Sequence, residues 1–491
     1  MAFAVPWAMT REPMSGADLA WLRMERPTNP MMVVAVLILG GRLQRRTLRS
    51  LLQERLLRFE RFRELPVHDA FGTHWQTARD FDLDAHLQCV RLPPRAGQEQ
   101  LEAEAGKLAS KQLDPRRPLW QIHLVERYRR GSAIIARFHH CYADGIALMR
   151  VLLSLTDSAP VASRVDANTA RDDGSSRESS PPALLEPLTG LFGSAALTLR
   201  DVSQSAAGLV GASLNMLAHP NRAAALAQQV ATASSELANI TLLPPDPKTP
   251  LKRRLSGHKQ VAWARPLPLR EVKTVAQALG CTINDVLLAT AAGALGSHLR
   301  QRGIATDAMT LRALVPVNLR PTSEQPRLGN EFGLVFASLP VGEPNPVARL
   351  YAVHFDMERL KHSSQAVVAL WLLTALGMVP GIIEDRAIEL FTSKASVVVS
   401  NVPGPRQPLY LAGARIEEQF FWVPQAGHIG VGISLLTYDD RVHFGVVADR
   451  NLIPAPREVA RRFPQEFEKL LLQVISGSVA AAPLLSRWTS A

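Results

Sequence analysis

The sequence predicts an α+β fold built in two folded parts. Strand-like and helix-like patterns are mixed in residues 1–157 and again in residues 251–491, and a stretch of different composition separates the two parts. Neither part shows the regular alternation of strand and helix that builds a doubly wound parallel sheet, so layers of mixed sheet and helix are the better prediction. A chain of 491 residues also exceeds what one hydrophobic core ordinarily organises.

The composition is that of a globular protein from a reducing compartment. Hydrophobic residues make up 47% of the chain and charged residues 20%, which argues against a disordered or fibrous protein. The three cysteines, Cys89, Cys141 and Cys281, form neither a CxxC pair nor a disulfide framework. The N-terminus lacks a basic start followed by a long apolar run, so we expect no secretory signal and a cytoplasmic location.

The first part contains both strand-like and helix-like segments. Residues 31–41 (MMVVAVLILGG) are typical of a strand that ends in a Gly-Gly turn, and residues 43–65 place leucines among charges at helical spacing. Strand and loop are expected at 75–92, and a short helix at 102–112. The segments LWQIHLVERY and SAIIARFHH predict an antiparallel pair, which the apolar helix 145–155 follows.

Composition changes in the middle of the chain. Residues 158–182 are rich in Ser, Asp, Arg and Pro and predict a mobile linker, because they hold too little apolar surface to order themselves. Residues 183–250 are rich in Ala, Leu and Ser and predict a helical connector. The final part begins with two helices, one closing at Gly280 and one capped by Thr282 or Asn284. Its expected strands are MTLRALVPVNL, LVFASLPV, ASVVVSNVPG, HIGVGISLLTYDD and RVHFGVVADR.

Charge and hydropathy limit the classes of partner. The formal net charge is +11, and the arginines between Arg42 and Arg63 fit the solvated face of a packed helix. An anionic membrane surface or a polyphosphate ligand such as coenzyme A would also suit this excess, whereas no nucleic-acid-binding module is present. The apolar stretch Gln365–Ile383 is broken by two glycines and a proline, which favours a buried or interfacial helix over a membrane span.

The segment FHHCYADG, from Phe138 to Gly145, is the candidate for chemistry. Side chains alternate along a strand, so His139 and His140 should face different surroundings. Asp144 precedes an apolar helix and could cap it, and Gly145 would allow a close backbone approach or an unusual φ angle.

Three interpretations of this segment stay open from the residues alone. It could be a strand end with one packed histidine and a capping aspartate. It could bind a metal, but the available further ligands, His86, His123, Asp80 and Asp82, lack ligand-like spacing, so we expect no metal. It could hold a general base, because a histidine accepts a proton near neutral pH. A Cys–His nucleophile at Cys141 is disfavoured, since sequence neighbours seldom have the geometry for proton transfer.

Several other enzyme classes lack their motifs. There is no GxSxG elbow for a serine hydrolase, no GxxxxGK[ST] phosphate loop and no GxGxxG dinucleotide fingerprint.

HHxxxDG alone is similar to the active-site motif of the wider coenzyme A-dependent acyltransferase superfamily. Further motifs accompany it: PMSGADLAWLRMERPTNPMMVV, the PLW motif at Pro118 to Trp120, Asn284-Asp285, VPVNLR at Val315 to Arg320, LGNEFG at Leu328 to Gly333 and SNVPGP at Ser400 to Pro405. This ordered set resembles the bacterial wax ester synthase/acyl-CoA:diacylglycerol acyltransferase family. The resemblance covers residues 13 to about 465 in the same order, with Gln121 and Met32 as modest departures.

This resemblance implies two chloramphenicol-acetyltransferase-like lobes, each a mixed sheet with helices, and a tunnel between them. His140 is then the general base and Asp144 a structural support, while His139 and Gly145 complete the motif. The resemblance leaves the donor for the developing oxyanion unnamed. As tunnel-lining candidates it adds Asn284, Asp285, Asn401, Gly404 and Trp120, although a helix cap, a strand-ending turn and a core position explain them equally well or better.

The implied reaction moves a long-chain fatty acyl group from acyl-CoA to diacylglycerol, to a long-chain alcohol, or to both. Acyl-CoA would be a substrate, with no permanently bound cofactor. Such apolar acceptors require access to a membrane or a lipid droplet, so we expect peripheral contact with the inner face of the plasma membrane or with lipid inclusions. Acylation of a polar acceptor and a non-catalytic lipid-binding role are the alternatives. The acceptor, the acyl chain length and the oligomeric state stay open.

Overall fold

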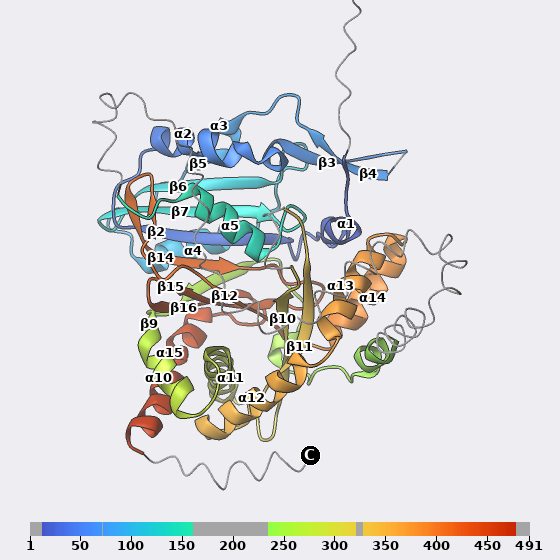
Figure 1. The fold of residues 1–491 in the computed structure, drawn as a ribbon, viewed down its shortest axis with the longest axis vertical. Coiled ribbons are helices and arrows are strands. Elements are labelled where there is room, and N and C mark those ends of the chain that lie inside the picture. The colour runs from blue at the N-terminus through green and yellow to red at the C-terminus, as the bar shows by residue number, and fades with distance from the viewer. Residues whose placement is uncertain (1–11, 71, 161–233, 321–327, 478–491) are drawn as a thin grey trace, which may run out of the picture.

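The computed structural model describes residues 12–70, 72–160, 234–320 and 328–477 (Figure 1). The linker expected at 158–182 and most of the connector expected at 183–250 lie outside the described residues. A helix over 234–242 belongs to the connector's described end. The labelled α-helices are α1 (Gly16–Arg23), α2 (Arg45–Arg55), α3 (Leu83–His86), α4 (Gln98–Ala109), α5 (Gly145–Leu155), α10 (Leu269–Ala278), α11 (Ile283–Gln301), α12 (Pro346–Lys361), α13 (Gln365–Leu376), α14 (Gly381–Ser393) and α15 (Pro456–Ile475).

Strands dominate the centre of the molecule. They are β1 (Glu12–Pro13), β2 (Met32–Leu39), β3 (Glu64–Asp69), β4 (Gly72–Thr77), β5 (Leu87–Cys89), β6 (Trp120–Tyr128), β7 (Gly131–His139), β8 (Lys259–Trp263), β9 (Leu267–Pro268), β10 (Leu311–Asn318), β11 (Phe332–Leu339), β12 (Val397–Pro403), β13 (Tyr410–Leu411), β14 (Ala414–Trp422), β15 (Val431–Tyr438) and β16 (Arg441–Asp449). Short 3-10 turns are η1 (Leu56–Arg58), η2 (Glu60–Arg63) and η3 (Pro250–Lys252).

The first lobe is built on a six-stranded sheet in the order β13-β14-β2-β7-β6-β5. The predicted pair β6 and β7 is antiparallel, and β7 also pairs with β2 so that Met32 lies opposite His139. This register puts the end of β7, where the two histidines lie, beside the start of β2. A small three-stranded sheet, β1-β4-β3, completes the lobe.

The second lobe is built on a seven-stranded mixed sheet in the order β11-β10-β12-β15-β16-β8, with β9 also paired to β16. Strands β10, β12 and β15 run parallel to one another, and the other pairs are antiparallel. Helices α10, α11, α12 and α15 cover one face of this sheet in the lower half of Figure 1. Helix α11 is buried over most of its length, since its leucine- and alanine-rich faces pack on both the sheet and α15.

The final part of the chain contributes two strands to the sheet of the first lobe. Strands β13 and β14 lie in the final part of the sequence, yet β14 pairs antiparallel with β2 of the first lobe. The mixed α/β architecture, with one large sheet in each lobe, confirms the predicted fold class. The lobe boundaries at residues 157 and 251 stay a prediction. They assign β13 and β14 to the second lobe by sequence, although these strands belong to the sheet of the first lobe.

One predicted helix is wrong in length. The expected helix over 43–65 ends at Arg55, and η1 and η2 follow it, because Phe59 has an extended backbone. After this break the side chain of Phe62 packs in a cluster of aromatic rings that includes Trp120. The carbonyl of Phe62 accepts a hydrogen bond of 2.9 Å from Trp120 Nε1. Burial of a large aromatic ring therefore outweighs the helical spacing of the leucines.

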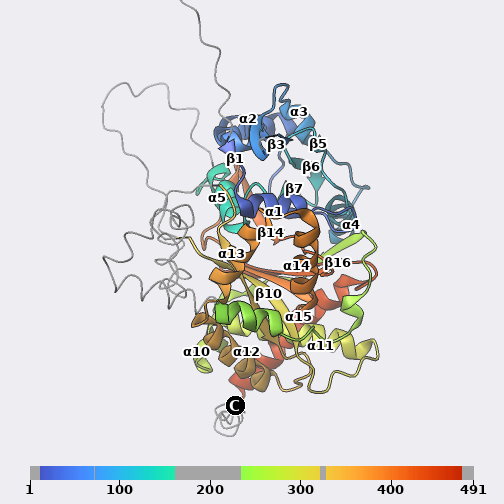
Figure 2. The same ribbon diagram turned by 90° about the vertical axis from the view of Figure 1, so that its right-hand side faces the viewer.

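The apolar stretch Gln365–Ile383 is two helices and not one. Helix α13 ends at Leu376, and α14 begins at Gly381. Both lie beside α1, as Figures 1 and 2 show from two directions. In the part of the chain that the structure describes, no single helix has the length and apolarity to cross a membrane. The pair α10 and α11 meets those criteria only when counted together, across a bend of 101°.

Candidate active site

The motif lies between the end of β7 and the start of α5. The backbone N–H of His140 donates to the carbonyl of Met31 at 2.8 Å, which continues the β2–β7 pairing for one more residue. The N–H of His139 donates to the carbonyl of Leu119 in the PLW motif at 2.9 Å. The motif therefore begins inside the sheet, where neighbouring strands fix its backbone on both sides.

His139 faces a carboxylate. Its Nε2 lies 3.4 Å from an oxygen of Glu25, and its Nδ1 accepts the N–H of Cys141 at 3.2 Å. Burial opposes ionisation of Glu25, but the hydrogen bond and charge of His139 outweigh it and hold the pKa of Glu25 below its ordinary value. His139 is thus engaged with its neighbours on both ring nitrogens.

His140 faces aromatic rings, as the alternation predicts. Trp21 of α1 stacks on it, with ring centroids 4.1 Å apart, and Phe332 of β11 lies on it with centroids 5.5 Å apart. Its Nδ1 is buried and has no hydrogen-bond partner among the described residues. The two histidines therefore have different surroundings: His139 contacts a carboxylate, and His140 packs between aromatic rings.

Burial sets the protonation state of His140. The side chain is 3% exposed, and this burial lowers its pKa to about 4, although the charge of Asp144 acts in the opposite direction. The imidazole is therefore neutral at physiological pH. A neutral ring is the form that can accept a proton.

Asp144 connects the motif to two other predicted motifs. Its Oδ1 accepts the N–H groups of Ile146 and Ala147 at the start of α5, so it is the helix cap that its position predicts. The same carboxylate binds the guanidinium of Arg320 from VPVNLR, at 2.8 and 2.9 Å, with both side chains 5% exposed. It also accepts the N–H of Glu331 from LGNEFG. Asp144 therefore has the contacts of a structural support.

Asn330 and Asp18 form part of the site that the sequence did not single out. Asn330 Nδ2 donates to the carbonyl of His140 at 2.8 Å and to Asp18 Oδ1 at 2.7 Å. Burial raises the pKa of Asp18 above its ordinary value, and the hydrogen bond from the Asn330 amide offsets only part of this effect. Asp18 lies in the motif PMSGADLAW and Asn330 in LGNEFG, so the family resemblance points to both residues. Their contact with each other does not follow from their positions in the sequence, which are 312 residues apart.

Gly145 does not need glycine for its backbone. It has no positive φ angle, and a Cβ there would meet only Val423, at 3.8 Å. The expected close approach or unusual conformation is therefore wrong for this residue. The space in front of it is open to a methyl group.

Trp120 is a core residue. It is 0% exposed, and its ring stacks on His86 with centroids 4.3 Å apart. Its Nε1 is satisfied by the Phe62 carbonyl. These contacts leave no face of the ring for a substrate, so we place Trp120 in the core and not on a tunnel wall.

The structure brings two of the remaining candidates together. Asn401 Nδ2 donates to Asn284 Oδ1 at 2.7 Å, which joins the end of β12 to the start of α11. Asp285 instead forms a capping box with Thr282 at the start of α11. Its carboxylate, which is 1% exposed, lies 2.8 Å from His354 Nδ1. Gly404 packs against the backbone of Thr437, where a Cβ would overlap the carbonyl oxygen. A role of these residues in a tunnel stays a prediction.

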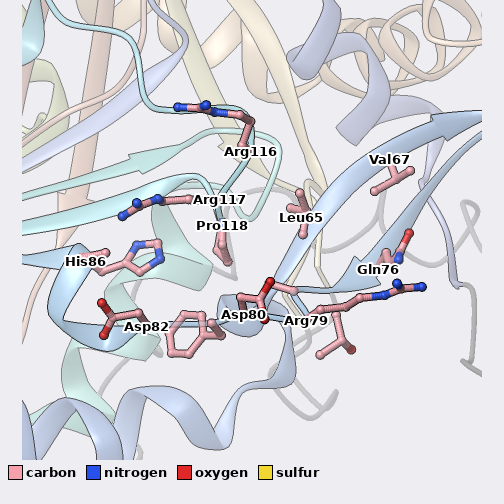
Figure 3. Close-up of a pocket in the computed structure, with 14 residues that line it drawn as sticks. Leu65, Val67, Gln76, Arg79, Asp80, Asp82, His86, Arg116, Arg117 and Pro118 are labelled. Carbon is pink, nitrogen blue, oxygen red and sulfur yellow. The ribbon is translucent and has the colours of Figure 1, made fainter.

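Two cavities in the structure lie away from the motif. One of about 400 Å³ is lined by apolar and charged side chains, and the charged ones include Arg79, Asp80 and Arg116 (Figure 3). Another of about 960 Å³ lies between α4 and the start of α15. No residue of FHHCYADG lines either one.

The side chains weighed as metal ligands do not form a centre. Asp80, Asp82 and His86 line the smaller cavity, but His86 Nδ1 is bonded to the Trp120 carbonyl at 2.7 Å. Within the described ranges, no three His, Cys, Asp or Glu side chains are grouped closely enough to hold a metal ion.

The described residues define a class of fold: two α/β lobes with a buried HHxxxDG histidine where the lobes meet. Solved structures share this fold. They include a wax ester synthase/diacylglycerol acyltransferase from Marinobacter aquaeolei VT8 (TM-score 0.65, 21% identity, 94% of this chain and 99% of that chain). They also include a trichothecene 15-O-acetyltransferase from Fusarium sporotrichioides (TM-score 0.58, 12% identity, 96% and 97%).

Family models give the narrower assignment. The wax ester synthase/diacylglycerol acyltransferase catalytic domain matches residues 14–287, and the C-terminal domain of the same family matches residues 328–471. The chain therefore belongs to this acyltransferase family, which confirms the resemblance drawn from the motifs. Two relatives from Mycobacterium tuberculosis, both provisionally named diacylglycerol O-acyltransferases, are 29% identical (94% of this chain, 90% of the relative) and 28% identical (84% and 84%).

Proposed function

We propose that the protein transfers a long-chain fatty acyl group from acyl-CoA to the hydroxyl of diacylglycerol, of a long-chain alcohol, or of both. The products are triacylglycerol and wax ester. The family membership and the names of the relatives support this substrate class. The observation that supports the chemistry best is the neutral, buried imidazole of His140, which lies between rings contributed by both lobes.

In the proposed reaction His140 is the general base. An imidazole nitrogen takes the hydroxyl proton of the acceptor while the acceptor oxygen attacks the thioester carbonyl carbon. The tetrahedral intermediate collapses as the carbon–sulfur bond breaks, and the imidazolium returns its proton to the departing thiolate, giving ester and free CoA. No acyl-enzyme forms, because both substrates react within one complex. Asp144 supports this geometry through Arg320 and the start of α5.

We assign the oxyanion donor to Trp21. A developing negative charge needs a fixed N–H or O–H donor in a dry environment. Trp21 Nε1 is buried, has no hydrogen-bond partner among the described residues, and belongs to the ring that stacks on His140. An unsatisfied buried donor beside the base is what such a role requires before substrate binds.

The location of the reaction is part of the proposal. Diacylglycerol and long-chain alcohols reside in lipid, so the enzyme works in the cytoplasm at the inner face of the plasma membrane or at lipid inclusions. The uncharged stretch Gln365–Ile383 and the net charge of +11 support peripheral contact.

An acceptor screen tests the proposed function. Release of CoA thiol from palmitoyl-CoA is measured with dioleoylglycerol, with hexadecanol and with polar amines or sugars, and the ester product is confirmed by mass spectrometry. Release that depends on either apolar acceptor, and that His140→Ala abolishes, is the expected result. Release with polar acceptors alone would select a different acyltransferase, and lipid binding without turnover would select a carrier.

A further inference from the structure

Exposed apolar side chains are concentrated on one corner of the molecule. Three of them form what we call the apolar elbow, where α13 turns into α14: Met378 (79% exposed), Ile382 (81%) and Ile383 (56%). Leu390 of α14 and two leucines of the adjoining helix 234–242 are exposed as well. In the described ranges, the other large apolar side chains with such exposure are Leu472 and Ile475, at the end of α15. Large apolar side chains exposed together at one turn indicate a contact site.

The chemistry of the apolar elbow fits neutral lipid. No charged residue occurs from 366 to 383, and the hydroxyl of Thr374 is satisfied by the Leu370 carbonyl. Glu384 follows directly but is 2% exposed and faces Arg23 at 3.7 Å, so it adds no surface charge. At the rim, Arg26 pairs with Asp385, and Arg386 pairs with Glu389. These pairs leave little net charge to attract an acidic or basic partner.

The elbow follows helix α13, which packs against α1, the helix that carries Trp21. Helices α13 and α1 lie together in Figure 2. They touch at two glycines: a Cβ at Gly377 would overlap the carbonyl oxygen of Gly16, and a Cβ at Gly16 would overlap that of Thr374. Arg23 donates to the carbonyls of Gly377 and Val379 at 3.2 and 3.0 Å, and so caps the end of α13. Trp21, which stacks on His140, precedes this arginine by two residues in the same helix.

Helix α13 also packs against the strand that carries Phe332, the second aromatic ring on His140. Helix α13 packs on β11, where a Cβ at Gly333 would overlap the carbonyl oxygen of Ala366. The residue before this glycine is Phe332, the second ring on His140. The helix that leads to the apolar elbow therefore positions both aromatic rings around the proposed base.

From these contacts we propose that the apolar elbow docks on a neutral lipid surface and delivers the acyl acceptor to His140 from that side. This inference rests on the proposed function for the identity of the acceptor, but the docking itself does not. Because the rim charges are paired, the contribution of the elbow comes from burial of apolar surface and adds to any attraction that the net charge of +11 exerts on acidic lipid.

Vesicle flotation tests the docking. The full chain is mixed with phosphatidylcholine vesicles that contain dioleoylglycerol. Replacing Ile382 and Ile383 together by Glu is expected to lower the bound-to-free ratio by roughly tenfold or more, since two charges enter the apolar contact. The matched control replaces Leu472 (64% exposed) and Ile475 (70%) by Glu. Both residues lie on α15, away from the elbow, and the binding of this control is expected to equal that of the unmodified protein. Met378→Lys is a second variant, and circular dichroism checks the fold of each.

Activity separates the docking from the proposed function. With dioleoylglycerol in vesicles, the elbow variant is expected to lose turnover in parallel with binding, while a short-chain alcohol below its solubility limit is acylated at the unmodified rate. Equal vesicle binding by the elbow variant and the control, or loss in the control alone, would overturn the docking. Elbow-dependent binding without acyl transfer to any acceptor would uphold the docking and refute the proposed function.

Discussion

At the scale of single residues, the neighbours of the two motif histidines distinguish them, because both side chains are equally buried, at 3% exposed. His139 contacts Glu25, whereas His140 lies between aromatic rings, where burial lowers its pKa to about 4. A neutral imidazole can accept the hydroxyl proton of the acceptor. The negative charge that then develops on the thioester oxygen needs a hydrogen-bond donor, which the proposed mechanism takes from the neighbouring indole ring.

Replacing Trp21 by Phe tests that donor. Phenylalanine keeps the stack on His140 but removes the indole N–H, so we expect kcat to fall on the order of 100-fold with little change in KM for acyl-CoA. Trp263→Phe is the matched control, because Trp263 Nε1 is also buried without a partner but lies in a different core cluster, away from the motif. Unchanged turnover in Trp21→Phe would remove the residue from the mechanism.

At this scale the sequence predicted the residues but not their contacts. HHxxxDG identified His140 and Asp144, and the helix cap by Asp144 followed from its position before an apolar run. The ion pair of Asp144 with Arg320 joins residues 176 positions apart, and no local pattern encodes it. The hydrogen bond from Asn330 to the His140 carbonyl is equally distant, at 190 positions.

At the scale of elements, a buried ion pair holds three helices of the second lobe together. Arg349 of α12 and Glu466 of α15 are 2.7 Å apart and 2% and 3% exposed. The same guanidinium donates to the Ala289 carbonyl of α11 at 2.9 Å. The pair therefore fixes how α11, α12 and α15 pack over the sheet that carries β10, β11 and β12.

Replacing Glu466 by Ala should destabilise this lobe strongly. The change leaves the Arg349 charge buried without its partner, which costs about 3–5 kcal/mol. We expect a clear fall in the thermal melting temperature, measured by calorimetry. Lys469→Ala removes the exposed partner of the same carboxylate and should cost less than about 1 kcal/mol. Equal melting of the two variants would show that the buried pair does not hold the helices.

Local pattern was sufficient for most elements of the first lobe and insufficient where distant packing decides. Strands β2, β6 and β7 and helix α5 lie where alternation and helical spacing predict them. The helix expected over 43–65 stops early because Phe62 is drawn into an aromatic cluster. Strand β14 was not predicted, since its partner β2 lies about 380 residues earlier in the chain and EEQF lacks clean alternation.

At the scale of the whole molecule, the two lobes are interlocked around the motif. Strand β14 places the final part of the chain inside the first lobe's sheet, and β11 returns Phe332 to His140 from the second lobe. Arg320 and Asn330, also from the second part, hold the motif from the other side. His140 therefore lies at a junction that exists only when both lobes are folded and assembled.

The activity of His140→Ala is the measurement that tests the central claim most directly. CoA release from palmitoyl-CoA with dioleoylglycerol or hexadecanol is compared with that of His443→Ala, which alters a second buried histidine whose pKa is also lowered to about 4 by burial. If His140 is the general base, its variant folds but loses activity on the order of a thousandfold, and the His443 variant keeps its turnover. Near-normal acyl transfer by a folded His140→Ala protein would contradict the account.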